Sequence, residues 1–356
     1  MSLPVKLSLP PMEALLVDRI PDGSGWQYEP KWDGFRCLAF RDGDKVTLQS
    51  KAGRPLTRYF PEVAEMLAAL PVKRFVIDGE LVVPVDGSLS FDDLLMRIHP
   101  AASRIQKLAA ATPASLVVFD MLADDRGQSL VELALSERRA ALEKCVVRAT
   151  ARAKAKTQPA STLVLSPATT SLRVAERWLK SGGGALDGVV AKKIDDKYHA
   201  GERTMIKVKR IRTADCVVGG FRYGTKSKTV GSLLLGLYDD EGLLHHVGFT
   251  SSLVAEVREQ LTTKLEKLRQ PPGFTGRAPG GPSRWSTERS TQWEPLAPKL
   301  VVEVQFDHVS GGRFRHGTKF LRWRPDKAPK QCTMEQLEST AHNMWKLLQK
   351  SRRTVA

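Results

Sequence analysis

The sequence changes character after Lys209, and this change narrows the possible folds more than any other feature. Up to that point, predicted strands alternate with predicted helices. Beyond it, short apolar runs such as DCVVGG, SLLLGLY and LLHHVGFT are separated by turn clusters. Short strands divided by closely spaced turns are typical of a small antiparallel barrel. We therefore expect two domains, with a barrel in the second.

The first domain is predicted to be built on antiparallel strands. Two alternating runs, 34–41 and 45–50, flank Asp42-Gly43-Asp44, and this tight-turn signal predicts a hairpin. The other expected elements are strands at 74–84 and 115–122 and helices after Pro61, over 129–147 and over 170–181. Strands and helices arranged in this way predict the α+β class.

The second domain is predicted to be a β-barrel of the OB type, with one helix at 253–268 inserted among its strands. A Pro/Gly-rich passage at 270–283 is expected to be a surface loop, as is the basic stretch 151–159 of the first domain. Thr333-Met-Glu-Gln336 indicates a capping box that opens a short C-terminal helix. The predicted boundaries are 1–209 for the first domain, 210–330 for the second and 331–356 for the helical tail.

The net charge favours a polyanionic partner. Lys and Arg number 55 against 39 Asp and Glu, so the formal net charge is +16. Residues 210–356 hold 24 of these basic residues and 14 of the acidic ones, and therefore carry +10 of this charge. A field of this size attracts nucleic acid, although a basic surface can also serve solubility alone. The charge suggests the partner but says nothing about the chemistry.

The composition argues against several other classes of protein. No apolar run approaches the length that crosses a membrane, and prolines interrupt the N-terminal segment, which argues against a signal peptide. Cys37, Cys145, Cys216 and Cys332 lie far apart and form no CxxC pair. They are predicted to be reduced thiols and not a disulfide frame or a zinc site. We therefore expect a cytoplasmic globular protein.

The segment Glu29-Pro-Lys31-Trp-Asp33-Gly34-Phe-Arg36 is the sharpest local sign of chemistry. It places a lysine just ahead of a predicted strand, after a proline that disfavours helix. A lysine attacks phosphorus only as the neutral amine, so it needs positive charge nearby or desolvation. Asp33 can orient the amine, and Gly34 allows the backbone to approach a ligand closely. Taken alone, such a segment is more often an exposed lysine before a turn.

Further short motifs follow along the chain. They are Val76-Ile-Asp78-Gly79-Glu80-Leu81, Val118-Phe119-Asp120, Leu186-Asp187-Gly188 through Lys192, Ile206-Lys207-Val208-Lys209 and Arg324-Pro-Asp326-Lys327. Each is weak by itself, because Asp-Gly-Glu is usually a turn, a phenylalanine in an apolar strand usually belongs to a core, and lysines usually form a solvated face. In this order and at these separations, the series resembles the motifs of the covalent nucleotidyltransferases, which are DNA ligases, RNA ligases and mRNA capping enzymes. The resemblance covers about residues 25–330.

The resemblance implies an antiparallel-sheet nucleotidyltransferase (adenylation) domain followed by an OB-fold domain, with ATP and Mg²⁺ or Mn²⁺ as cofactors. It implies that Lys31 is the nucleophile that AMP modifies, with Asp33 beside it. The implied nucleotide contacts are Glu29 at the adenine edge, Phe119 on the adenine face, Arg36 and Glu80 at the ribose, and Lys192, Lys207 and Lys209 at the phosphates. The implied metal ligands are Glu80 and Asp187, since carboxylates suit a hard cation. By the same resemblance, the barrel swings over the nucleotide so that Arg324 and Lys327 orient the departing pyrophosphate, and Lys51 and Arg54 contact DNA at a nick.

Three positions depart from the usual pattern of that superfamily. Asp187 stands where Glu is usual, which shortens the reach to a metal by one methylene group. Met205 stands where an aromatic residue often precedes the paired lysines. Lys51 stands where many ligases have Arg, so the charge is present without the bidentate guanidinium group.

The second domain indicates which branch of that superfamily the chain resembles. Its segments Trp293-Glu-Pro295, Leu300-Val-Val-Glu303-Val304 and Gly311-Gly312-x-Phe314-Arg315 are similar to the barrel of compact bacterial ATP-dependent ligases. These ligases include the C-type and the ligase module of the end-joining D-type proteins. The resemblance implies a monomeric ATP-dependent DNA ligase that seals 3′-hydroxyl/5′-phosphate nicks in duplex DNA through a lysyl-AMP intermediate. It would act in repair at the nucleoid, with other repair proteins as further partners. The alternatives are an RNA ligase, a capping guanylyltransferase or a non-catalytic OB-fold protein that binds nucleic acid.

Overall fold

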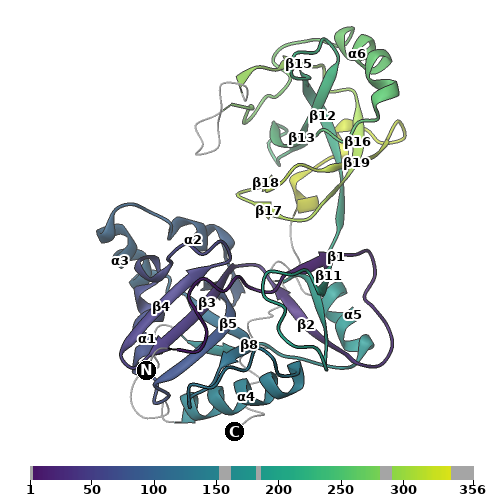
Figure 1. Ribbon diagram of the computed structural model, residues 1–356. Coiled ribbons are helices and arrows are strands. Elements are labelled where there is room, and N and C mark those ends of the chain that lie inside the picture. The colour runs from purple at the N-terminus through teal and green to yellow at the C-terminus, as the bar shows by residue number, and fades with distance from the viewer. Residues whose placement is uncertain (1–2, 152–161, 182–185, 281–290, 338–356) are drawn as a thin grey trace. The chain divides into compact units, whose positions relative to one another are not determined.

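The computed structural model describes residues 3–151, 162–181, 186–280 and 291–337. They divide into two compact units between Arg210 and Ile211 (Figure 1). The predicted basic loop at 151–159 lies outside the described residues except for its first one, as do the end of the Pro/Gly-rich passage and the helix expected beyond residue 337. Within the described part of the chain, no helix is both long and apolar enough to cross a membrane.

The first unit contains a five-stranded sheet in the order β4-β3-β5-β8-β9 (Figure 1). Its strands are β3 (Phe35–Asp42), β4 (Lys45–Ser50), β5 (Arg74–Val82), β8 (Ser115–Ala123) and β9 (Leu163–Leu165). The antiparallel pairing of β3 with β4 confirms the predicted hairpin. The strand predicted to reach residue 84 ends at Val82, because a separate short hairpin follows, made of β6 (Pro84–Val85) and β7 (Ser88–Leu89).

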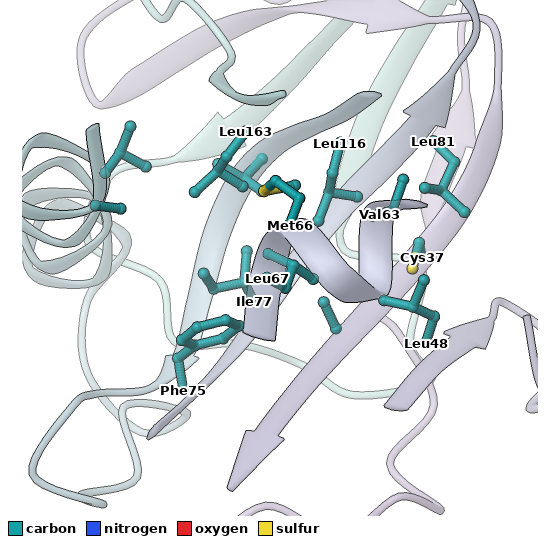
Figure 2. Close-up of a cluster of buried hydrophobic side chains, with 14 of the residues drawn as sticks. Cys37, Leu48, Val63, Met66, Leu67, Phe75, Ile77, Leu81, Leu116 and Leu163 are labelled. Carbon is teal, nitrogen blue, oxygen red and sulfur yellow. The ribbon is translucent and has the colours of Figure 1, made fainter. Parts of the chain in front are cut away.

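A hydrophobic core lies between one face of this sheet and its helices. The helices are η1 (Thr57–Tyr59), α1 (Pro61–Ala69), α2 (Phe91–Met96), α3 (Ala102–Ala111) and α4 (Leu135–Ala151). Figure 2 shows Met66 and Leu67 of α1 lying over the sheet beside Ile77 and Leu116. Alternate residues of each strand point to this side, so the intervening residues are left for the opposite face.

The helix predicted over 129–147 begins only at Leu135, so its N-terminal bound was wrong. The residues before it form a turn in which the Asp124 carboxylate accepts hydrogen bonds from the backbone N–H groups of Arg126 and Gln128. The N–H of Leu130 then bonds back to Leu122 in β8. A local side-chain bond of this kind competes with helix formation. Helices α2 and α3 are additional to the predicted elements.

A second sheet of four strands is ordered β1-β11-β10-β2. Its strands are β1 (Ala14–Leu16), β2 (Trp26–Trp32), β10 (Leu186–Lys193) and β11 (Met205–Lys209), and α5 (Leu172–Ser181) packs on β2 and β10. Lys31 was expected just ahead of a strand, but it lies inside β2. Pro30 does not prevent this, because β2 is an edge strand and an edge strand tolerates a residue without an N–H group.

Buried side chains join the two sheets. Leu38, Phe40 and Val76 of the first sheet share a cluster with Met205 of the second. Trp32 of β2 shares another cluster with Val82 and Val117. The face of the five-stranded sheet that the helices leave uncovered is therefore turned toward the second sheet.

The second unit is a small antiparallel barrel around its own core. Its main sheet is ordered β14-β13-β12-β16-β19, with β15 added to β12. The elements are β12 (Arg212–Tyr223), β13 (Val230–Tyr238), β14 (Leu244–Thr250), η3 (Ala255–Val257), α6 (Arg258–Glu266), β15 (Glu294–Pro295), β16 (Val301–Phe306), β17 (Val309–Ser310), β18 (Arg313–Phe314), β19 (Lys319–Trp323), η4 (Pro329–Gln331) and η5 (Met334–Leu337). A bridge between Thr250 and Thr318 links the two ends of the main sheet.

The strands of this unit and the presence of one inserted helix follow the prediction, and the α+β class is confirmed. The bounds predicted for that helix, 253–268, were wrong: α6 spans only Arg258–Glu266 and is preceded by the 3-10 helix η3. The Gln336 side chain of the predicted capping box at Thr333 bonds elsewhere than a capping box requires. The Gln336 amide hydrogen-bonds the backbone of Asp215 on β12, and residues 334–337 form a 3-10 turn.

Candidate active site

A pocket lies between the two sheets of the first unit. The predicted site residues that line it are Glu29, Lys31, Arg36, Lys51, Glu80, Phe119, Lys192 and Lys207. They come from the six strands β2, β3, β5, β8, β10 and β11 and from the turn after β4. Four other predicted residues of this unit, namely Asp33, Arg54, Asp187 and Lys209, do not line the pocket. Arg324 and Lys327 belong to the second unit.

The alternation of strand residues explains how Arg36 and Glu80 reach the pocket. Cys37 and Leu81 belong to the core under the helices, so their neighbours Arg36 and Glu80 point to the opposite face. The two residues also pair directly across β3 and β5. Phe119 lies at an irregularity of β8, where Asp78 pairs with Asp120 but Gly79 pairs with Val118. Such a bulge re-aims a side chain, in this case into the pocket.

Lys31 forms an ion pair with Asp187. The register between β2 and β10 shifts between Leu186 and Gly188, and this bulge brings Asp187 beside the lysine. Gly188 has a φ of +151°, and a Cβ atom there would lie 1.9 Å from the backbone oxygen of Val208. Only glycine therefore fits the bulge that carries Asp187.

Gly34 lies where the chain itself leaves no room for a side chain. A Cβ atom at this position would lie 2.2 Å from the backbone oxygen of Leu81 and 2.8 Å from the side chain of Glu80. The residue just before β3 thus passes close to β5, and only a glycine fits there. Asp33 lies near enough to Glu80 for its charge to raise the pKa of that carboxyl group.

Glu29 and Lys192 form a buried ion pair of 2.8 Å from Nζ to Oε2. Gln27 donates a hydrogen bond of 2.8 Å to the other oxygen of Glu29. The Lys192 amine lies 4.8 Å from the centre of the Phe119 ring, and the Arg36 guanidinium lies 4.7 Å from it. Two cations thus contact one aromatic ring, an arrangement that orients both the ring and the cations.

Arg36 is held by residues that the sequence analysis did not select. Its Nε and Nη2 atoms donate to the two oxygens of buried Asp78 at 2.6 and 2.7 Å. The hydroxyl of Tyr198 donates to Asp78 at 2.7 Å and accepts the backbone N–H of Met12. Asp78 belongs to the Asp-Gly-Glu motif, although no role was predicted for it. Tyr198 has no feature in the sequence that would have identified it.

Among the carboxyl groups that line the pocket, Glu80 has the pKa that is shifted furthest from its ordinary value. Burial raises the pKa of Glu80 to about 7, while the positive charges of Lys31 and Arg36 oppose the rise. Within the described residues, no group of three or more acidic, His or Cys side chains could hold a metal ion on its own. Mg²⁺ is commonly bound by one or two carboxylates together with phosphate oxygens of the substrate, so Glu80 and Asp187 fit that kind of site.

Three of the predicted lysines, Lys51, Lys207 and Lys209, lie near one another. Lys207 lines the pocket, and desolvation together with the charges of Lys31, Lys51 and Lys209 lowers the pKa of Lys207. Lys51 lies 3.0 Å from the Glu13 carboxylate, and this contact lowers the pKa of Glu13. Lys51 was expected to contact DNA, and the structure places it at the same pocket as the nucleotide residues. Arg54 is exposed.

The two predicted cations of the second unit share one carboxylate. Arg324 donates to both oxygens of Asp215 at 2.9 and 3.1 Å, and Lys327 donates to Asp215 at 2.8 Å. Arg324 also contacts Asp326. Asp215 is another residue that the sequence analysis did not select.

A lysine amine set among carboxylates and cations in a pocket has the groups that transfer of a phosphoryl or nucleotidyl group requires. Residues 12–209 match the family described as "ATP dependent DNA ligase domain", and residues 226–327 match "ATP dependent DNA ligase C terminal region". The chain belongs to the ATP-dependent DNA ligase family. The resemblance drawn from the motifs is therefore confirmed.

Relatives of nearly the same length support this assignment. DNA ligase C2 of Mycolicibacterium smegmatis is 46% identical, over 96% of this chain and 98% of the relative. DNA ligase C of Mycobacterium tuberculosis is 44% identical, over 95% of this chain and 96% of the relative. Among solved structures, a Lig E DNA ligase superposes with a TM-score of 0.51 at 16% identity, covering 88% of this chain and 99% of that one, which is a likeness of fold.

Proposed function

We propose that the chain seals 3′-hydroxyl/5′-phosphate nicks in duplex DNA by three displacements at phosphorus, beginning with transfer of AMP from ATP to Lys31. The observation that carries the proposal is the setting of Lys31. Its amine contacts Asp187, and it lines a pocket that also holds Glu80 and Lys207. The names of the DNA ligase C relatives support DNA as the substrate.

In the first displacement, Lys31 Nζ forms a bond to the α-phosphorus of ATP while the bond from that phosphorus to the pyrophosphate oxygen breaks. The amine must give up a proton before it attacks, and the Asp187 carboxylate in contact with it can accept one. The negative charge of the phosphates would be neutralised by cations, as phosphoryl transfer requires. These cations are Lys207 and Lys209 of the first unit and Arg324 and Lys327 of the second. Lys192, which was also predicted to contact the phosphates, pairs with Glu29, the residue proposed for the adenine edge.

The nucleoside of ATP would be held by the remaining pocket residues. Glu29 would read the adenine edge, and its oxygens are oriented by Gln27 and Lys192. Phe119 would stack on the adenine face. Arg36 and Glu80 would contact the ribose, with Arg36 fixed in place by its bidentate bonds to Asp78.

A Mg²⁺ or Mn²⁺ ion would be held by Glu80 and Asp187 and would supply additional neutralisation of phosphate charge when bound. Asp33 would affect metal binding through Glu80, because its negative charge raises the pKa of the Glu80 carboxyl group. Beyond the proton transfer, the protein would accelerate the first step by positioning the amine against the phosphorus and by neutralising negative charge, because it forms no other covalent bond in that step.

In the second and third displacements, AMP passes to the 5′-phosphate at the nick, and the 3′-hydroxyl then displaces AMP and closes the backbone. Lys51 and Arg54 would contact the DNA phosphates near the nick. The net charge of +16 favours binding of the duplex as a whole. We place the enzyme in repair, acting as a monomer at the bacterial nucleoid alongside other repair proteins.

Incubation with α-labelled ATP and a divalent metal tests the first displacement. We expect a covalent, acid-labile adduct with the wild type and none with Lys31→Ala. Lys73→Ala is the matched control, because Lys73 is an exposed lysine of the same unit that pairs with Asp44. The proposal fails if the wild type forms no adduct with either Mg²⁺ or Mn²⁺.

The choice of nucleic acid needs a separate test. Nicked duplexes made entirely of DNA, with RNA on one side of the nick, or entirely of RNA would be compared at equal concentration. We expect the all-DNA nick to be sealed fastest. Faster sealing of the all-RNA nick would contradict the proposed substrate.

A further inference from the structure

Asp215 is the point at which the two cations of the Arg324–Lys327 motif meet. Its carboxylate accepts two hydrogen bonds from Nη1 of Arg324, at 2.9 and 3.1 Å, and one from Nζ of Lys327, at 2.8 Å. Its side chain is only 12% exposed. Asp215 lies on β12, whereas both cations follow β19, so the carboxylate and the cations come from different parts of the barrel.

The backbone of Asp215 is fixed from two directions. It pairs with Glu303 of the neighbouring strand β16. Its N–H donates to the side-chain oxygen of Gln336 at 2.9 Å, and its carbonyl accepts from the nitrogen of the same amide at 3.1 Å. A carboxylate held in this way can set the position of a long side chain that bonds to it.

Asp326 bonds to a different edge of the Arg324 guanidinium group from Asp215, and it is much more exposed to solvent. It accepts from Nε and Nη2 of Arg324. Its side chain is 62% exposed, five times the exposed fraction of the Asp215 side chain. The exposed carboxylate is the one that an incoming anion can displace at little cost, because water already solvates it. The Nε–Nη2 edge of Arg324 can then face a phosphate while Nη1 stays bonded to Asp215.

We infer that Asp215 is a positioning residue for the first displacement, one that holds Arg324 and Lys327 together so that the pair meets the departing pyrophosphate as a unit. The inference rests on the role proposed above for these two cations. Without Asp215, each long side chain would have to be ordered by the pyrophosphate itself, and two positive charges would repel each other. The residue would thus act through the cations and need not touch the nucleotide.

Single-turnover adenylation and sealing of a pre-adenylated nick, measured with the full chain, test this inference. Asp215→Asn should slow adenylation at saturating ATP by about 10- to 100-fold, because a displaced charged group loses that much. It should leave sealing of the pre-adenylated nick within about threefold of the wild type, since no pyrophosphate departs in that step. Asp240→Asn, at an exposed aspartate of the same unit, is the matched control and should change neither rate.

A mutant cycle that removes both cations separates positioning from a purely structural effect. If Asp215 acts only through Arg324 and Lys327, the triple variant Asp215→Asn/Arg324→Ala/Lys327→Ala should adenylate no more than about threefold slower than Arg324→Ala/Lys327→Ala. Losses that multiply would overturn the inference. So would faster adenylation or a lower KM for ATP in Asp215→Asn, which would mean that Asp215 withholds the cations.

Two further outcomes are distinguishable. If Asp215→Asn does not fold, as judged by thermal unfolding, Asp215→Glu moves the carboxylate by one methylene group and should still slow adenylation without slowing sealing. A wild-type rate in a folded Asp215→Glu variant would then count against the inference. If the wild type itself forms no lysyl-AMP, the proposed function fails, whereas a wild-type adduct with an unimpaired Asp215→Asn variant overturns only the role of Asp215.

Discussion

Lys31 and Asp187 form an ion pair across two neighbouring strands, at the bulge where β10 shifts its register against β2. The predicted nucleophile and a predicted metal ligand are thus in contact with each other. We therefore expect the same carboxylate to act on the amine and on a bound cation. This relationship makes Asp187 the residue whose replacement tests the metal assignment most directly.

Asp187→Asn should raise the metal concentration that half-saturates adenylation by about tenfold or more, because an amide is a poorer ligand for a hard cation than a carboxylate. Asp187→Glu should remain near the wild type, since it keeps the charge. Adduct yield across a titration of Mg²⁺ and of Mn²⁺ measures the effect. Asp195→Asn, an exposed residue just beyond β10, is the control. An unchanged metal requirement in Asp187→Asn would remove Asp187 from the metal site.

Gly188→Ala should destabilise the first unit by on the order of 3 kcal/mol, because the added methyl group meets the Val208 backbone at a φ that disfavours other residues. Gly43→Ala is a matched control. Gly43 also has a positive φ, but a Cβ atom there meets nothing within 4 Å, so only the conformational cost of about 1–2 kcal/mol remains. Urea denaturation of both variants gives the comparison, and equal losses would show that the collision at Gly188 is relieved.

Lys51→Ala should reduce the salt dependence of nicked-DNA binding, lowering the slope of log K against log salt by about 1 if one phosphate contact is lost. Arg54→Ala should do the same. Lys73→Ala, which removes an exposed lysine paired with Asp44, should leave the slope unchanged. Binding measured at several salt concentrations checks this. An affinity and a slope that both equal the wild type would mean that Lys51 does not contact a DNA phosphate.

His246 makes the stability of the second unit depend on pH. Burial, followed by the charges of Arg313, Arg222 and Arg277, lowers the pKa of His246 to about 3, and the neutral ring pairs with Arg313 at 2.8 Å. The unfolded chain binds a proton near pH 6.5, so stability is complete above that pH and falls as the pH decreases toward 3.

By pH 5 the loss from this group should be on the order of 2 kcal/mol. His246→Gln keeps an acceptor for Arg313 and should lack this part of the decline. His316→Gln, at an exposed histidine, should decline as the wild type does. Denaturation of the three proteins between pH 5 and 7.5 compares them, and a parallel decline in His246→Gln would rule out this histidine as the cause.

Much of the site could be predicted from the sequence because covalent nucleotidyl transfer requires particular residue types. A lysine nucleophile, acids suited to a cation and lysines for phosphates stand in short motifs that occur in order along the chain. The structure collects eight of those residues at one pocket. The strands that carry them also show alternation, which is why the hairpin of β3 and β4 and the strands β5 and β8 were predicted.

The partners of these residues could not be predicted in the same way. Tyr198 lies 120 residues from Asp78 along the chain, and Asp215 lies 109 residues from Arg324, so no local spacing connects them. The start of α4 was also misplaced, because a turn at Asp124 bonds to β8 and competes with the helix.

The sequence by itself determined the class of the protein, the two-domain order and the groups predicted to carry the chemistry, since these depend on residue type and short-range periodicity. Only the tertiary structure decided which charges meet: Lys31 with Asp187 at a bulge, and Arg324 with Asp215 on a barrel strand. Ion pairing depends on distances of a few ångströms between atoms on different strands. Those distances are set by register, bulges and close packing, such as that of Gly188 against Val208, and they exist only once the sheets have formed.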